Sequence, residues 1–129
     1  MAPNPSPLAA QRILIVDDQD SIRDILRTAL TEAGAVVLEA TGGAIGVEMA
    51  TRQVPDLILL DIAMPGMSGP ALQEELRHRG VEIPIVFVTG HEDESVRPTL
   101  LAGGAVECLF KPFSDAALLG ALNAALRVA

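Results

Sequence analysis

The chain has 129 residues, half of them hydrophobic, which is enough for one domain whose core needs no disulfide or metal to hold it together. Its formal net charge is −8, from 17 acidic and 9 basic residues, and such a surface repels nucleic acid. No apolar run approaches the roughly 18 residues of a membrane helix, and the single cysteine, Cys108, excludes an internal disulfide. We therefore expect a soluble, cytoplasmic protein that binds neither membrane nor nucleic acid directly.

Residues 1–11 contain three prolines and lack the basic segment followed by an apolar one that marks a secretion signal. We therefore expect a disordered N-terminal arm over residues 1–11 and one folded domain over residues 12–128. No linker to a second domain is visible in the sequence, and we expect a complete, stand-alone protein.

The first apolar run, at residues 12–16, predicts a buried strand that ends in two acids, Asp17 and Asp18. The next segment has the apolar spacing of an amphipathic helix. Ser21, with an acid three residues later, predicts the start of this helix, and Gly34 predicts its end. The residues expected on its inner face are Ile22, Ile25, Leu26, Ala29, Leu30 and Ala33.

The middle of the chain contains four consecutive apolar residues, 57–60, followed by Asp61 and the turn residues Pro65 and Gly66. A run this short and this apolar is typical of a strand buried on both faces, as in the middle of a parallel sheet. Its final acid stands where open α/β sheets bind their ligands. Taken alone, Asp61 is equally consistent with a residue that only caps a turn.

The remaining segments continue the alternation of strands and helices. Glycines weaken the expected helix at residues 42–52, and their spacing does not match a dinucleotide-binding loop. Further strands are expected at residues 35–39, 83–88 and 105–110, and further helices from Ser68 to Gly80, from Ser95 to Ala102 and from Ser114 onward. Five such units predict an α/β fold with a parallel sheet, right-handed crossovers and helices on both faces.

Polar residues of complementary chemistry follow four of the five expected strands. Asp17 and Asp18 follow the first, Asp61 the third, Thr89 the fourth and Lys111, the only lysine, the fifth. Because the carboxyl ends of parallel strands lie at one edge of a sheet, these side chains are expected to converge. A core does not require residues of these types at these positions, so the set predicts a functional site.

The motifs at the strand ends are Val16-Asp17-Asp18, Leu60-Asp61 through Gly69, Val88-Thr89-Gly90 and Gly104-Ala105 through Lys111-Pro112-Phe113. Together they resemble the receiver domains of two-component response regulators, over essentially the whole chain from Gln11 onward. Residues 64–69 and 89–91 are most similar to FixJ-type receivers. The resemblance implies a doubly wound flavodoxin-like (βα)5 fold with strand order 2-1-3-4-5 and a site at the switch point between the first and third strands.

A magnesium site is expected at the three acids. Carboxylates within about 5 Å of one another repel by roughly 3–4 kcal/mol per pair at an effective dielectric of 20, and a hard divalent cation relieves that repulsion. Asp17 and Asp18 are the expected metal-holding pair, with Asp61 as the third acid; the resemblance adds the backbone carbonyl of Ala63. Mn²⁺ could take the same place. Asp20 is assigned to the helix start and not to the metal.

Asp61 is then the expected phosphoacceptor, because a carboxylate can take a phosphoryl group as an acyl phosphate. Lys111 offers a charge to one phosphoryl oxygen, the hydroxyl of Thr89 can donate a hydrogen bond to another, and Gly90 leaves the access open. The implied donor is a sensor histidine kinase or a histidine phosphotransfer protein. Modification would change binding to an unknown downstream protein through the face made by the fourth helix, fifth strand and fifth helix, in a monomer or weak dimer.

Other functions stay open. The domain could serve as a phosphate sink, or as a pseudo-receiver that binds partners without chemistry. An aspartate-nucleophile phosphatase is a third option, but it requires a second acid two residues after the nucleophile, where this chain has Ala63. No turnover of a free metabolite is expected, so the protein is not classed as an enzyme.

The sequence departs from the family at Cys108, where receivers usually carry an aromatic residue that swings inward on activation. The small size of Cys108 favours a core role over a redox one, and Phe110 is expected on the opposite face of the strand. Activation is therefore expected to move residues 89–102 without an aromatic swing. His91 could place or exclude the hydrolytic water, or have no role, and the resemblance implies a cis peptide before Pro112.

Overall fold

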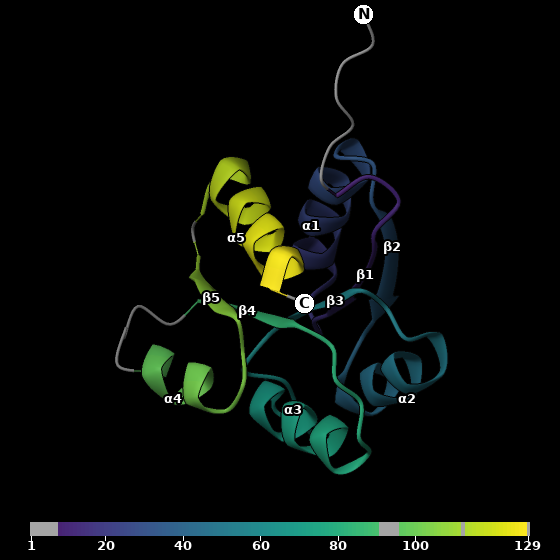
Figure 1. Cartoon of the computed structure of the whole chain (residues 1–129), viewed down its shortest axis with the longest axis vertical. Helices are drawn as coiled ribbons and strands as arrows, with labels where there is room; N and C mark the ends of the chain where they lie inside the picture. Colours follow the sequence, from purple (N-terminus) through teal and green to yellow (C-terminus); the bar gives the residue numbers. More distant parts are fainter. Residues whose placement is uncertain (1–7, 91–95, 112, 129) are drawn as a thin grey trace, which may run out of the picture.

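The computed structural model describes residues 8–90, 96–111 and 113–128. It is a five-stranded parallel sheet in the order β2-β1-β3-β4-β5, with α1 and α5 on one face and α2, α3 and α4 on the other (Figure 1). The predicted fold and strand order are confirmed. The elements are β1 Arg12–Val16, α1 Asp20–Glu32, β2 Val36–Ala40, α2 Gly43–Gln53, β3 Leu57–Leu60, α3 Gly69–His78, β4 Ile85–Thr89, α4 Val96–Ala102, β5 Glu107–Phe110 and α5 Asp115–Val128.

The core has two halves, one on each face of the sheet, because successive side chains of a strand point to opposite faces. In β1, Ile13 and Ile15 pack toward α1 and α5, whereas Leu14 and Val16 pack toward α2, α3 and α4. All four residues of β3 are buried. The apolar run that predicted a central strand is therefore explained by the helices that cover both of its faces.

The register of the strands brings their polar ends to one edge of the sheet. Val16 is paired with Leu60, and Leu60 with Phe87, so the residues that follow β1 and β3 lie side by side. The amide of Asp61 donates to the carbonyl of Val16 at 3.0 Å, and the amide of Lys111 donates to the carbonyl of Thr89 at 2.8 Å. Backbone pairing thus continues past the strand ends into the predicted site.

Two expectations about α1 are wrong. The helix begins at Asp20 with Gln19 at its N-cap, and no side chain caps it, because the carboxylate of Asp17 accepts the amide of Gln19 and organises the turn one step earlier. Ile25 was expected on the inner face but is 60% exposed. It lies at the edge of the apolar stripe, one helical step of 100° from Leu26, on the side that is open to solvent.

A disordered arm was expected over residues 1–11, and for residues 8–11 this expectation is wrong. Leu8 is 1% exposed and packs in the core half beneath α1 and α5. The amide of Ala10 donates to the carbonyl of Gly34 at 2.9 Å. A single apolar side chain between alanines and prolines gave no periodic signal, yet it fills a place in the core.

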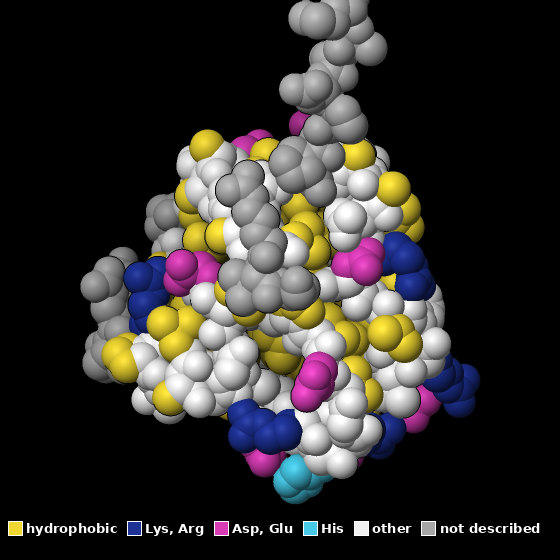
Figure 2. Space-filling model, in the orientation of Figure 1, with side chains coloured by type: hydrophobic (Ala, Val, Ile, Leu, Met, Phe, Trp, Pro, Cys, Tyr) yellow, Lys and Arg dark blue, Asp and Glu magenta, His cyan; other side chains and the backbone are white. Residues whose placement is uncertain are grey.

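The expected starts of α3 and α5 are confirmed. Ser68 and Ser114 cap α3 and α5, accepting the amides of Ala71 at 3.2 Å and Ala117 at 3.0 Å. Within the described residues, no helix is both long and apolar enough to cross a membrane. Acidic and basic side chains lie interspersed on the face shown in Figure 2, without a broad basic patch on that side.

Candidate functional site

Three carboxylates meet at the carboxyl edge of the sheet. Asp17 and Asp18 follow β1 and Asp61 follows β3, and one carboxylate oxygen from each lies within 4.8 Å of the others. Asp17 is 1% exposed and Asp61 is 9% exposed, whereas Asp18 is exposed. The convergence that the strand ends predicted is therefore present for all three acids.

The two other predicted residues close the site from β4 and β5. Lys111 places its Nζ 3.9 Å from Oδ2 of Asp17, and Thr89 is buried at the end of β4. A hollow of about 310 Å³ opens between these residues and the acids. Its lining is Gln19, Ile22, Asp61, Ala63, Thr89, Gly90 and Lys111. Gln19 and Ile22 were not predicted as site residues; they belong to the start of α1, which lies directly after the acid pair.

Burial and mutual repulsion raise the pKa values of two of the three acids, Asp17 and Asp61. Burial raises the pKa of Asp61, and the neighbouring charge of Asp17 raises it further, while Lys111 acts in the opposite direction. Burial also raises the pKa of Asp17, against the stabilising hydrogen bond that its carboxylate accepts from the amide of Gln19. The site therefore holds negative charge that the protein alone only partly compensates.

The acids fit a hard divalent cation. One carboxylate oxygen from each of the three residues lies within 4.8 Å of the others. Asp18 is open to solvent, as a cation that retains water requires. Ala63 lies in the lining of the same hollow. Asp17, Asp18 and Asp61 are the residues that would hold the ion, and its charge would offset their repulsion and that of an incoming phosphoryl group.

The loop after Asp61 is held tightly against the acid by Gly69. A methyl group added at Gly69 would lie 2.3 Å from the carbonyl oxygen of Asp61 and 2.8 Å from the ring of Phe87. The amide of Gly69 also donates to the carbonyl of Ile62 at 2.8 Å. The start of α3 can therefore approach Asp61 only because this residue has no side chain.

Cys108 is fully buried in the core half beneath α3 and α4, and burial raises the pKa of its thiol. Phe110 packs against that same half. The expectation that Phe110 faces the other side is wrong, because residues two apart in a strand share a face. The guanidinium of Arg97, on α4, lies 5.8 Å from the centre of the Phe110 ring.

Arginine residues make the contacts that sequence reasoning missed. Arg97 donates to the carbonyl of Cys108 at 2.9 Å and pairs with Glu107 at 3.1 Å, which ties α4 to β5. Arg23, on α1, is buried beside Asp17. The only signal for Arg23 was a charged residue next to the apolar stripe of the helix. His91 and Pro112 lie outside the described residues.

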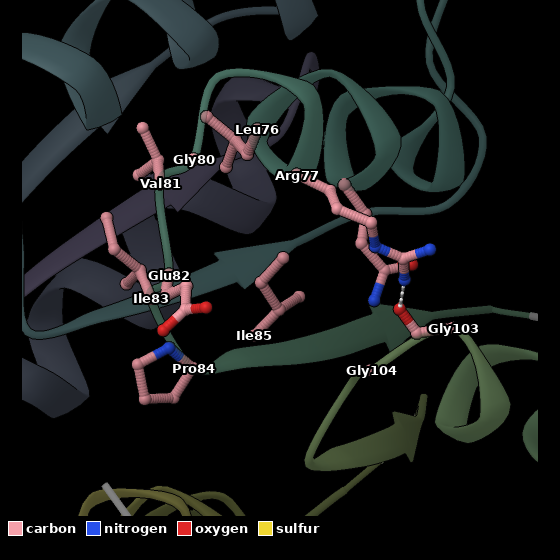
Figure 3. Close-up of a pocket in the computed structure, with 11 residues that line it drawn as sticks. Leu76, Arg77, Gly80, Val81, Glu82, Ile83, Pro84, Ile85, Gly103 and Gly104 are labelled. Atoms are coloured by element: carbon pink, nitrogen blue, oxygen red, sulfur yellow. Dashed lines mark hydrogen bonds between the residues drawn. The ribbon is translucent and has the colours of Figure 1, made fainter.

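A second hollow, of about 520 Å³, lies at the opposite edge of the sheet, between the end of α3, the segment before β4 and the turn after α4 (Figure 3). In this hollow Arg77 donates to the carbonyl of Gly103. Glu82 is the only acid among its lining residues. The group of carboxylates that could hold a metal is at the other edge.

These features define a doubly wound α/β domain with an acid site at the switch point of its sheet. The family model of the response regulator receiver domain matches residues 13–123, and the chain belongs to this family: it is the receiver domain of a response regulator in a two-component system. Receiver domains are phospho-acceptors that interact with histidine kinases or phosphotransfer proteins and generally bind Mg²⁺ through acidic residues.

Similar proteins agree with this assignment. The chain is 33% identical over 120 residues to the response regulator protein TodT of Pseudomonas putida, covering 93% of this chain and 53% of TodT. It is 34% identical over 112 residues to the transcriptional regulatory protein FixJ of Azorhizobium caulinodans, covering 87% of this chain and 53% of FixJ. It spans about half the length of these relatives. A response regulator receiver domain protein from Clostridium thermocellum superposes with a TM-score of 0.85 at 28% identity, covering 92% of this chain and 95% of that one.

Proposed function

We propose that Asp61 accepts a phosphoryl group from a histidine kinase or a histidine phosphotransfer protein, in a reaction that requires Mg²⁺. The observation that carries this proposal is the meeting of three carboxylate oxygens within 4.8 Å beside Lys111. Asp61 is the member of the three that lines the hollow together with Thr89 and Lys111. It is therefore the acid that a phosphoryl group entering the hollow would meet.

In the proposed step, a carboxylate oxygen of Asp61 forms a bond to phosphorus while the bond from phosphorus to the donor's imidazole nitrogen breaks. The imidazole leaves with the electron pair of that bond. Lys111 neutralises one phosphoryl oxygen and the hydroxyl of Thr89 donates a hydrogen bond to another. The chemistry is mostly alignment and charge neutralisation, so fixed side chains at the edge of a rigid sheet suit it.

We propose that the modification is read out at the α4-β5-α5 face. Thr89 ends β4, and the described part of the chain resumes at α4, which Arg97 ties to β5. We expect a shift of Thr89 toward the phosphoryl group to be accompanied by a shift of α4. A sink function would need only the chemistry at Asp61, so partner binding that changes on phosphorylation would favour the signalling role.

The direct test is the intact mass of the protein after incubation with acetyl phosphate, with and without Mg²⁺. We expect the wild type to gain one phosphoryl group only when Mg²⁺ is present, and Asp61→Asn to gain none. Asp24→Asn is the matched control, because Asp24 is an exposed acid of α1 that pairs with Arg27 and does not belong to the group of three. Equal modification of wild type and Asp61→Asn would overturn the proposal.

A further inference from the structure

Arg23 is a buried cation directly behind the acid site. Its side chain is 10% exposed, although arginine is seldom buried without partners. One guanidinium nitrogen, Nη1, donates to the backbone carbonyl of Asp17 at 2.6 Å, and this hydrogen bond is itself buried. Arg23 does not line the hollow between Asp61 and Lys111, so it has no direct access to a ligand there.

The remaining guanidinium nitrogens are held by other elements. Nε lies 3.5 Å from Glu39 at the end of β2, and Nη2 pairs with Asp20 in the first turn of α1. The planar guanidinium thus joins the ends of β1 and β2 to the start of α1. The carbonyl that it holds belongs to the peptide that links Asp17 to Asp18, the two acids expected to hold the cation.

We infer that Arg23 is a positioning residue for the acid site: it fixes the peptide between Asp17 and Asp18 so that both carboxylates face Asp61. This inference rests on the proposed function, because it concerns the same magnesium and phosphoryl site. Partners behind the ligands of a metal typically change metal affinity by about 10–100-fold when they are removed. The amide of Gln19 anchors the carboxylate of Asp17, and Arg23 anchors its backbone.

The charge of Arg23 and its positioning role predict opposite effects on Mg²⁺ affinity when the residue is removed. A positive charge close to the acids competes with a bound cation, so its removal would strengthen Mg²⁺ binding if charge were its only contribution. If Arg23 acts by position, its removal weakens Mg²⁺ binding. Arg23→Lys separates the two further, because lysine keeps the charge but has no planar fork to reach the Asp17 carbonyl and Glu39 together.

Arg27 provides the matched control. It lies one turn further along α1 and, like Arg23, contacts Glu39, in its case at 3.0 Å. No hydrogen bond or ion pair described for Arg27 reaches Asp17. Arg27→Met therefore removes an arginine contact to the same glutamate, Glu39, while Arg23 still donates to the carbonyl of Asp17. It should leave Mg²⁺ affinity unchanged.

The experiment titrates Mg²⁺ alone into wild type, Arg23→Met, Arg23→Lys and Arg27→Met, following the backbone amides of Gln19 and Asp61 by NMR, with thermal unfolding in EDTA as the folding control. We expect Kd for Mg²⁺ to rise about tenfold in Arg23→Met and in Arg23→Lys. Wild-type affinity in Arg23→Lys, or tighter binding in Arg23→Met, would overturn the inference. If Arg23→Met does not fold, Arg23→Lys decides. Absence of Mg²⁺ binding in the wild type would instead overturn the proposed function.

Discussion

The ammonium of Lys111, which follows β5, lies 3.9 Å from a carboxylate oxygen of Asp17, which follows β1. The strands β3 and β4 lie between these two in the sheet. The ion pair therefore crosses the carboxyl edge above Asp61 and brings a positive charge over the site. Lys111 therefore offsets part of the negative charge of the acids, and in the proposed reaction it would turn to a phosphoryl oxygen.

Lys111→Met should separate cation binding from phosphorylation. Removing the ammonium leaves the acids less compensated, so Mg²⁺ should bind at least as tightly as in the wild type. The rate of phosphorylation by acetyl phosphate at saturating Mg²⁺ should fall about 10²–10³-fold, as when one fixed charge-stabilising group is removed from a reaction site. Mass spectrometry over time measures the rate, and NMR titration measures the affinity. A wild-type rate in this variant would contradict the role given to Lys111.

The raised pKa values of Asp17 and Asp61 predict how stability depends on pH without Mg²⁺. Both pKa values lie above the unfolded value of 3.8, so the folded state holds these protons more firmly than the unfolded state. Their stabilising contribution is present below pH 3.8 and is lost as the pH rises through the folded pKa. We expect thermal unfolding in EDTA to show a loss of stability as the pH rises above about 4.

Asp61→Asn should remove part of the loss of stability that the wild type shows as the pH rises without Mg²⁺. Carboxylate oxygens that lie within 4.8 Å of one another repel by about 3 kcal/mol or more at an effective dielectric of 20, so the variant should be more stable than the wild type by about 1–3 kcal/mol at pH 7 in EDTA. The difference should shrink near pH 4 and when Mg²⁺ is added to the wild type. Equal stability of the two proteins at pH 7 in EDTA would count against the repulsion between these acids.

Gly69→Ala should destabilise the domain by about 1–3 kcal/mol, as overpacking of a tight core does. The added methyl group would meet the carbonyl of Asp61 and the ring of Phe87. It should also slow phosphorylation, because the loop that follows Asp61 would have to shift. Gly120→Ala is the matched control: it lies within α5 with open space around it and should gain up to about 1 kcal/mol from helix propensity. Chemical denaturation measures both.

Leu8→Ala should destabilise the domain by about 2–5 kcal/mol, because it empties a buried site. Ile25→Ala, at an exposed position, should change stability by about 0.5 kcal/mol or less. Urea unfolding of the two variants compares an apolar residue outside the expected domain with one inside its expected core. Equal stability of Leu8→Ala and wild type would mean that Leu8 is dispensable for the core.

The parts of the molecule that the sequence made predictable are those set by local chemistry repeated along the chain. The apolar run of β3 and the polar residues Asp17, Asp61, Thr89 and Lys111 predicted a parallel sheet and its converging edge, because the carboxyl ends of parallel strands lie together. The strand order was predicted by the resemblance to receiver domains. Ser68 and Ser114, at the expected starts of α3 and α5, were likewise readable, since each accepts the amide three residues later. The same signal at Ser21 gave a wrong start for α1.

The parts that were missed depend on contacts between different elements, which the residue pattern within one element does not reveal. Leu8 is buried because the side of the sheet beneath α1 and α5 has a place for it, and nothing next to it in the sequence says so. Arg23 and Arg97 act through carbonyls of Asp17 and Cys108 that belong to other elements. The side on which Phe110 lies was readable from the two-residue period of a strand, and that expectation was simply wrong.

Both faces of β3 are covered and its two neighbours are strands, so Asp61 follows a strand that is enclosed by other elements. In the proposed reaction, this acid is therefore the fixed reference against which a phosphoryl donor would align. A rearrangement after the proposed modification would then fall to the turns and helices around β3. The reacting atom and the elements that respond to it would belong to separate parts of one small sheet.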